Sequence, residues 1–180
     1  MSMAVFGFYY AATPAAGATM LSRIHYGFAL LGVLAMAPGI AIVATGGAES
    51  GIQVIDLSDP TNPTGVASAI DGANGFDQLG LAWGVDTFVI GDKTYAIVVA
   101  KVNHVTNDFT AAGIQVIDLS DPANPTAVAS RNEGDPGFED FAKAIAVDTF
   151  IISDKTYAIV PIMNDDGLRV IDLSDPANPT

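Results

Sequence analysis

Two aspartates at matching places of a repeated sequence could hold a divalent cation. Asp86 is the second residue of an apolar run at residues 85–90, and Asp148 is the second residue of its copy at residues 147–152. Carboxylate oxygens are ligands that calcium prefers. If each run forms the innermost strand of a sheet in a closed ring, Asp86 and Asp148 point into the central channel and supply a calcium site. The alternative is that the repeated Asp serves the framework of the fold.

A further set of acidic residues lies in two matching links, residues 69–84 and 131–146. Both links contain a Gly-Phe-acid motif, which ends at Asp77 in the first link and at Glu139, next to Asp140, in the second. These carboxylates could bind calcium or contact a partner. In the alternative interpretation, the phenylalanines of the motif fill the gaps between sheets and the acids face solvent.

His104 and Asp108 lie in a segment that lengthens the second unit, between Val98 and Gly113. One imidazole without a second His, a Cys or a nucleophile does not make a catalytic group. We therefore expect His104 and Asp108 to be loop residues available to a ligand. The sequence has no glycine-rich phosphate loop, paired-histidine zinc motif or nucleophile elbow, so it predicts no catalytic residue and favours a protein without enzymatic activity.

Three more aspartates precede a turn with two prolines. Asp56, Asp118 and Asp172 are each followed by Leu-Ser and then by Asp-Pro-x-Asn-Pro. An Asp side chain at such a place can accept a hydrogen bond from a nearby backbone N–H group and fix the turn. A metal site is the alternative, but the spacing of an EF-hand loop is absent. We therefore assign these three residues to the turns.

All of these residues are positioned by a unit that the chain repeats. Its signature, Gly-Ile-Gln-Val-Ile-Asp-Leu-Ser-Asp-Pro, begins at Gly51 and Gly113 and recurs with two changes from Gly167. Two apolar runs joined by a short polar link precede it and predict a tight hairpin, and a shorter run follows it. Four antiparallel strands in a unit of this length are typical of a propeller blade. The sequence predicts an all-β fold of about three four-stranded antiparallel blades in an incomplete ring, at residues 40–79, 80–142 and 143–180.

The signature resembles that of the LVIVD-repeat family of β-propeller proteins, whose hallmark is an apolar strand, an Asp and an Asp-Pro-x-Asn-Pro-like turn. The resemblance covers about residues 40–180, and it implies a secreted or cell-surface protein of a family that mostly lacks an assigned chemistry. Propellers typically close with about four to eight blades. We therefore expect a fragment of a longer array, with residues 4–12 supplying the missing outer strand as the alternative. Residues 40–180 alone are expected to associate, because the last sheet has an open edge.

The first 39 residues form a separate apolar segment that could be helical. They suit a signal or anchor that starts at Met20 and ends near a small-residue cleavage site at residues 35–37. Residues 40–44 match the repeat and predict a strand of the first unit. Because Pro38 and Gly39 interrupt the apolar run, we expect no stable membrane span beyond this signal or anchor.

The composition narrows the classes of partner. The formal net charge of −13 repels phosphate backbones, so nucleic acid is not an expected partner. The absence of cysteine excludes disulfides and thiolate metal sites. A protein, a glycan or a cation remains, and calcium is the one cofactor that the acidic residues suggest.

The sequence supports three hypotheses of function. The first is a non-catalytic extracellular or cell-surface β-propeller repeat module that binds a protein, a glycan or a cation, because the units share a framework and differ in one loop. The second is a calcium-assisted propeller hydrolase with Asp86 and Asp148 as ligands. The third is a structural protein of a surface coat.

Overall fold

The computed structural model describes residues 32–33, 39–46, 50–101, 112–163 and 167–180. Apart from one short 3-10 helix, the regular structure of these residues is β-strand. The elements in chain order are β1 (Gly32–Val33), β2 (Ile40–Thr45), β3 (Gly51–Asp56), β4 (Thr64–Ile70), β5 (Ala82–Ile90), β6 (Lys93–Ala100), β7 (Gly113–Asp118), β8 (Thr126–Asn132), η3 (Phe141–Lys143), β9 (Asp148–Ile152), β10 (Lys155–Ile162) and β11 (Gly167–Asp172).

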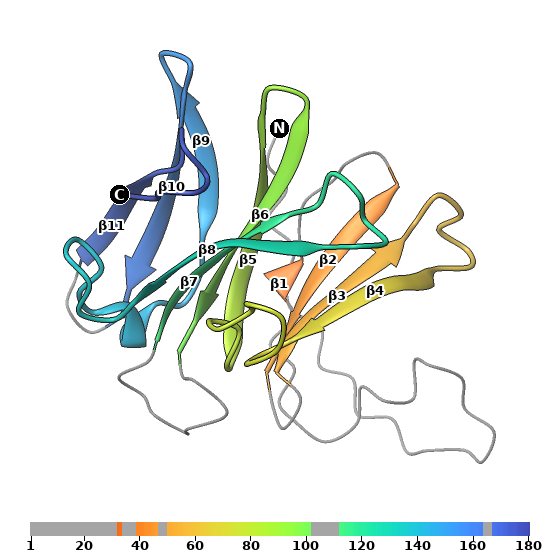
Figure 1. Cartoon of the computed structure of the whole chain (residues 1–180), viewed down its shortest axis with the longest axis horizontal. Coiled ribbons are helices and arrows are strands. Elements are labelled where there is room, and N and C mark those ends of the chain that lie inside the picture. Colours follow the sequence, from red (N-terminus) through yellow and green to blue (C-terminus); the bar gives the residue numbers. More distant parts are fainter. Residues whose placement is uncertain (1–31, 34–38, 47–49, 102–111, 164–166) are drawn as a thin grey trace.

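The strands form three separate antiparallel sheets that follow one another along the chain. Strands β1 to β4 form the first sheet and β5 to β8 the second, and β9 to β11 form a third sheet of three strands. Figure 1 shows the sheets side by side as an open fan, with the second sheet between the other two. The first strand of each sheet lies toward the same side, because β5 contacts β1 on one side and β9 on the other. This arrangement of successive antiparallel meanders, two of four strands and one of three, confirms the predicted propeller-type blades in an incomplete ring.

The repeated signature forms the third strand of each sheet, as predicted. Strand β3 pairs with β2 and β4, β7 pairs with β6 and β8, and β11 pairs with β10. A shift of register interrupts β3 after Val54 and interrupts β7 at the matching place after Val116. The signature strands therefore lie in three different sheets and do not pair with one another.

Tight hairpins join the first two strands of the second and third sheets. Ile90 pairs with Lys93 and Ile152 pairs with Lys155, so each loop has two central residues. Gly91 takes a positive φ of 64° in one hairpin, whereas Ser153 and Asp154 take φ of 50° and 64° in the other. The twist of the strands requires left-handed backbone in such turns, which explains the short polar links in the sequence.

The glycine that opens the signature allows the outer strand to approach closely. A Cβ atom at Gly51 would lie 2.0 Å from the carbonyl oxygen of Ala69, and one at Gly113 would lie 1.9 Å from that of Arg131. No side chain fits at these distances. The glycine is therefore needed in the first two units because the paired outer strands β4 and β8 come too close at this point for a side chain.

The third sheet reaches the start of an outer strand. The backbone N–H group of Asp172 donates to the Thr180 carbonyl at 2.7 Å, and the N–H group of Thr180 donates back at 3.2 Å. The same pair occurs at the start of β4 and of β8, where Thr64 faces Asp56 and Thr126 faces Asp118. In the described residues, no strand pairs with the rest of the outer edge of β11.

The hydrophobic core lies between the sheets. Ile42, Ile52 and Val54 of the first sheet pack against Val98 and Ile117 of the second. The other face of the second sheet packs against the third through a larger cluster that includes Tyr95, Ile97, Ile114, Val116, Phe138, Phe141, Val160 and Ile171. The second sheet is therefore covered on both faces, which accounts for the unbroken apolar runs in its strands.

The segment 1–39 is described only at Gly32–Val33 and Gly39. Strand β1 pairs with β2 through Gly32 and Val33, so the first sheet begins within this segment. The expected helix, signal and cleavage site at residues 20–37 otherwise lie outside the described residues. In the part of the chain that the structure describes, no helix has the length and apolarity needed to cross a bilayer.

Candidate functional site

Asp86 joins two neighbouring blades. It lies on β5, and its Oδ2 atom accepts hydrogen bonds from the backbone N–H group of Thr149 at 2.6 Å and from the Thr149 hydroxyl at 2.7 Å. The same hydroxyl also donates to the Thr87 carbonyl at 3.0 Å. Thr149 belongs to β9, so these contacts connect the innermost strands of the second and third sheets. We call this group of Asp86, Thr87 and Thr149 the β5–β9 clasp.

The environment of the clasp shifts the pKa of Asp86. Burial raises the pKa of this carboxyl above its usual value of 3.8, the hydrogen bonds from Thr149 oppose the shift, and the charge of Asp148 adds to it. Burial prevails because it disfavours the charged form more than the hydrogen bonds favour it. The folded chain therefore holds the proton of Asp86 more tightly than the unfolded chain does.

This shift predicts a pH dependence of stability that Asp86→Asn removes. Because the folded pKa is raised, the contribution of Asp86 to stability is fully present below pH 3.8 and is lost as the pH rises through the folded pKa. Asn keeps an oxygen that can accept from Thr149 but does not titrate. Urea unfolding at a series of pH values should show that the stability of the unsubstituted protein falls relative to that of D86N between pH 3.8 and the folded pKa of Asp86. Above that pKa, the difference in stability between the two proteins should stay constant. Parallel profiles of the two proteins would contradict the prediction.

Asp148 is the second of the two predicted calcium ligands. It is exposed on β9, and its Oδ1 atom accepts from the N–H group of Thr149 at 3.1 Å. The structure thus brings Asp86 and Asp148 to the same pair of strands, close enough for the charge of one to act on the other. Within the described ranges, no three His, Asp or Glu side chains come close enough to hold a metal ion together.

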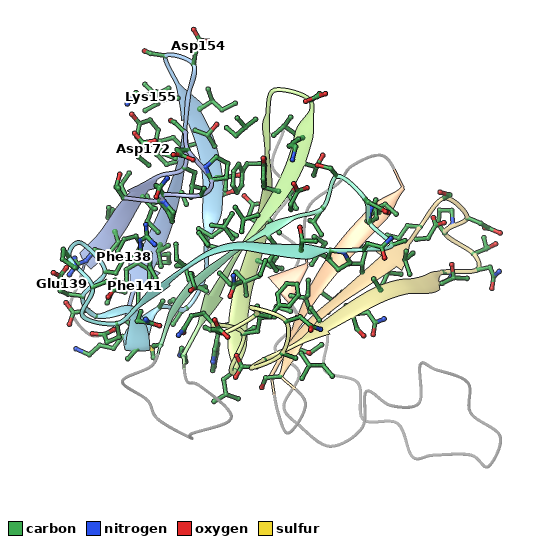
Figure 2. All side chains as sticks on the ribbon, in the orientation of Figure 1. Phe138, Glu139, Phe141, Asp154, Lys155 and Asp172 are labelled. Carbon is green, nitrogen blue, oxygen red and sulfur yellow. The ribbon has the colours of Figure 1, made fainter. Side chains whose placement is uncertain are left out.

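The aspartates of the signature fix the turns. The N–H groups of Ser58, Ser120 and Ser174 donate to the Oδ1 atoms of Asp56, Asp118 and Asp172 at 2.7, 2.8 and 2.9 Å. This confirms the assignment of these residues to the turns. Two of these three carboxylates also form an ion pair with a lysine. Lys93 Nζ lies 3.0 Å from Asp118 Oδ2, and Lys155 Nζ lies 3.1 Å from Asp172 Oδ2 near the tip of the β9–β10 hairpin (Figure 2).

Hydrogen bonds from the side chain and backbone of Ser174, together with Lys155, lower the pKa of Asp172 to about 2. Each of these contacts favours the ionised carboxylate, so Asp172 keeps its charge far into the acid range. The signature aspartate of the third unit therefore acts as a charged acceptor that orders a turn.

The acids of the links lie around two buried phenylalanines. Phe76 and Phe138 are buried between sheets, as the alternative interpretation of the Gly-Phe-acid motif expects. Figure 2 shows Glu139 beside Phe138, at the edge of the third sheet. Asp77 and Glu139 themselves are exposed.

Several carboxylates of the links accept hydrogen bonds from backbone N–H groups or pair with an arginine side chain. Glu133 accepts from the N–H groups of Asp140 and Ala142, both at 2.8 Å. Asp140 Oδ2 lies 2.9 Å from Arg169 Nη2. Asp71 accepts from the N–H group of Leu79 at 2.9 Å. The links are thus held in shape largely by their own acids. The other two predicted loop residues, His104 and Asp108, lie outside the described residues.

The structure shows two features that no motif of the sequence predicts. Lys101 Nζ lies 3.6 Å above the centre of the Trp83 ring, at the ends of β5 and β6. A groove of about 640 Å³ lies between β4 and the double-proline turn that precedes β8, and we call it the β4 groove. Its lining includes Ala69, Ile70, Asn74, Phe76, Asn124 and Pro125. The one signal for Trp83 was that it is the single tryptophan of the chain.

The fold and the repeated turn define the class of protein: an all-β, propeller-type repeat protein whose blades form an open arc. The chain carries three LVIVD repeats, recognised at residues 43–70, 109–132 and 152–180. No curated protein matches the sequence.

Among solved structures, an α-L-arabinofuranosidase from Lactobacillus brevis is similar, with a TM-score of 0.51 and 13% identity over 84% of this chain. The chain spans 52% of the length of that enzyme. At this level of identity the likeness concerns the fold.

Proposed function

We propose that this chain is a non-catalytic β-propeller module that acts outside the cell or on its surface and binds a protein, a glycan or a cation. The observation that carries the proposal is the use of the recurring carboxylates. Asp56, Asp118 and Asp172 order turns, and Asp86 joins two blades. Because these carboxylates already hold turns and blades together, we assign partner binding to the loops and links between strands.

Three features support the proposed location and partner. LVIVD repeats are typical of extracellular proteins, and the apolar residues 20–37 suit a signal or anchor ahead of the propeller at residues 40–180. The net charge of −13 suits a saline exterior and attracts cations. The exposed acids Asp77 and Glu139, with Asp140, lie in links that run between blades and are the surface we propose for contact.

A calcium-assisted hydrolase is the second candidate. It is favoured by one observation: Asp148 lies near enough to Asp86 to raise the pKa of the latter. Two carboxylates that repel each other gain from a divalent cation placed between them. The competing role of Asp86 is the β5–β9 clasp, in which the same oxygen already accepts two hydrogen bonds.

A calcium titration followed by thermal unfolding separates the two candidates. We expect no rise of melting temperature at millimolar calcium that depends on Asp148, because the Asp86 oxygen beside it is already engaged in the clasp. A cation bound only by the folded state must raise stability with its concentration. A rise that disappears in Asp148→Asn but persists in Asp92→Asn, an exchange at the tip of the β5–β6 hairpin, would place calcium at Asp148 and favour the second candidate over the first.

A further inference from the structure

The β4 groove occupies a place that an arginine fills in the next pair of blades. Ala69 on β4 pairs with Ile52, and Arg131 on β8 pairs with Ile114, the matching residue of the second unit. Ala69 and Arg131 are therefore equivalent positions of two successive outer strands. The chain carries a methyl group at one of them and a guanidinium on a long stem at the other.

Arg131 connects its blade to the double-proline turn of the following blade. Its Nε atom donates to the Pro179 carbonyl at 3.2 Å, and its Nη1 atom donates to the Ser130 carbonyl at 3.0 Å. The side chain is half-buried. Two carbonyl oxygens, one from each blade, thus form an acceptor pair for a guanidinium.

The β4 groove has the equivalent groups without the arginine. Ser68 and Pro125, the counterparts of Ser130 and Pro179, both line the groove. The buried ring of Phe76 and the side chain of Ala69 provide apolar lining, on which the aliphatic stem of an arginine can pack. Ile70, which also lines the groove, is half exposed. The groove therefore combines an apolar lining with two residues whose counterparts accept hydrogen bonds from Arg131 through their carbonyls.

We propose that the β4 groove binds an arginine side chain presented by a peptide or protein partner. The guanidinium donates to the carbonyls of Ser68 and Pro125 in the way that Arg131 donates to Ser130 and Pro179, and the stem covers Phe76. The net charge of −13 draws a cationic segment toward the chain. The bound arginine links the first blade to the second, as Arg131 links the second to the third.

This site goes beyond the function proposed above. It uses neither the exposed link acids nor Asp86 and Asp148, so loss of arginine binding leaves the calcium test and the loop surface unaffected. The two proposals can fail separately.

The test is an NMR titration of the isotope-labelled 180-residue chain with a short peptide that carries one arginine. Shifts should gather at Ala69, Asn74 and Ala127, and the citrulline peptide of the same sequence should bind about tenfold more weakly, because it lacks the charge that strengthens the hydrogen bonds. N-acetylarginine amide is the second arm: equal affinity would assign recognition to the side chain alone, and weaker affinity would assign part of it to the partner backbone. Equal binding of the arginine and citrulline peptides would overturn the proposal.

Matched variants give the site a sharper test. Ala69→Arg places an arginine of the chain itself in the groove and should abolish peptide binding, whereas Val66→Arg adds the same charge to β4 at a residue outside the lining and should leave it unchanged. Arg131→Ala should open an equivalent groove and raise the number of bound peptides from one to two. Undiminished binding to a folded A69R protein, or a single peptide on folded R131A, would contradict the proposal.

Discussion

Replacing Phe138 by alanine is expected to lower the free energy of unfolding by about 3–5 kcal/mol, the usual loss when a buried aromatic ring is removed from a core. The ring is 1% exposed and lies 5.4 Å from the ring of Phe141, which is fully buried. Both come from the link between the second and third sheets and pack into the core that joins them. The cavity therefore removes a buried contact by which this link is packed between the blades.

Phe150→Ala is the matched control for this prediction. Phe150 is also an aromatic residue of the third unit and stacks on Tyr157 at 5.6 Å, but it is only partly buried. Its removal leaves no closed cavity, so we expect a loss below about 2 kcal/mol. Urea unfolding of the three proteins measures both values. Equal losses for the two variants would show that the core between the blades does not carry the stability assigned to it.

The repeat was sufficient to predict the fold. The apolar run from Thr94 to Val99 follows a short polar link, and a second run of β-branched and aromatic residues precedes that link. Two such runs around a short polar link predict a hairpin from the local sequence alone. Three copies of the signature allowed the prediction for each unit to be checked against the others. The strand from Ile40 was predicted in the same way, by its match to Ala96-Ile97-Val98, and the structure confirms it as β2.

The contacts between blades could not be predicted in the same way. Asp86 was placed on the innermost strand, yet its partner Thr149 belongs to the next sheet, and nothing in the local sequence pairs the two. The β4 groove depends on the difference between Ala69 and Arg131, which has meaning only once the register of β4 and β8 shows them to be equivalent. Hydrogen bonds and grooves that arise from packing of distant segments need coordinates.

The outward face of the third sheet is the other feature that only the packing shows. Ile114 and Val116 of β7 are 0% exposed because the third sheet covers them. Their counterparts on β11, Leu168 and Val170, are 54% and 51% exposed. A face built to be covered in one blade is thus open in the next, and exposed apolar faces of this kind mark sites of association.

We therefore expect the 180-residue chain to self-associate through this face, and Val170→Lys to weaken the association about 100-fold or more, since a charge buried without a partner is costly. Val89→Lys is the matched control, because Val89 is 56% exposed and lies near the tip of the β5–β6 hairpin, away from this face. Sedimentation velocity over a range of concentrations measures the effect. Assemblies that grow without limit would favour the surface-coat hypothesis, because head-to-tail contacts that do not close form filaments. A monomer at all concentrations, or equal weakening by both substitutions, would contradict the assignment of this face to association.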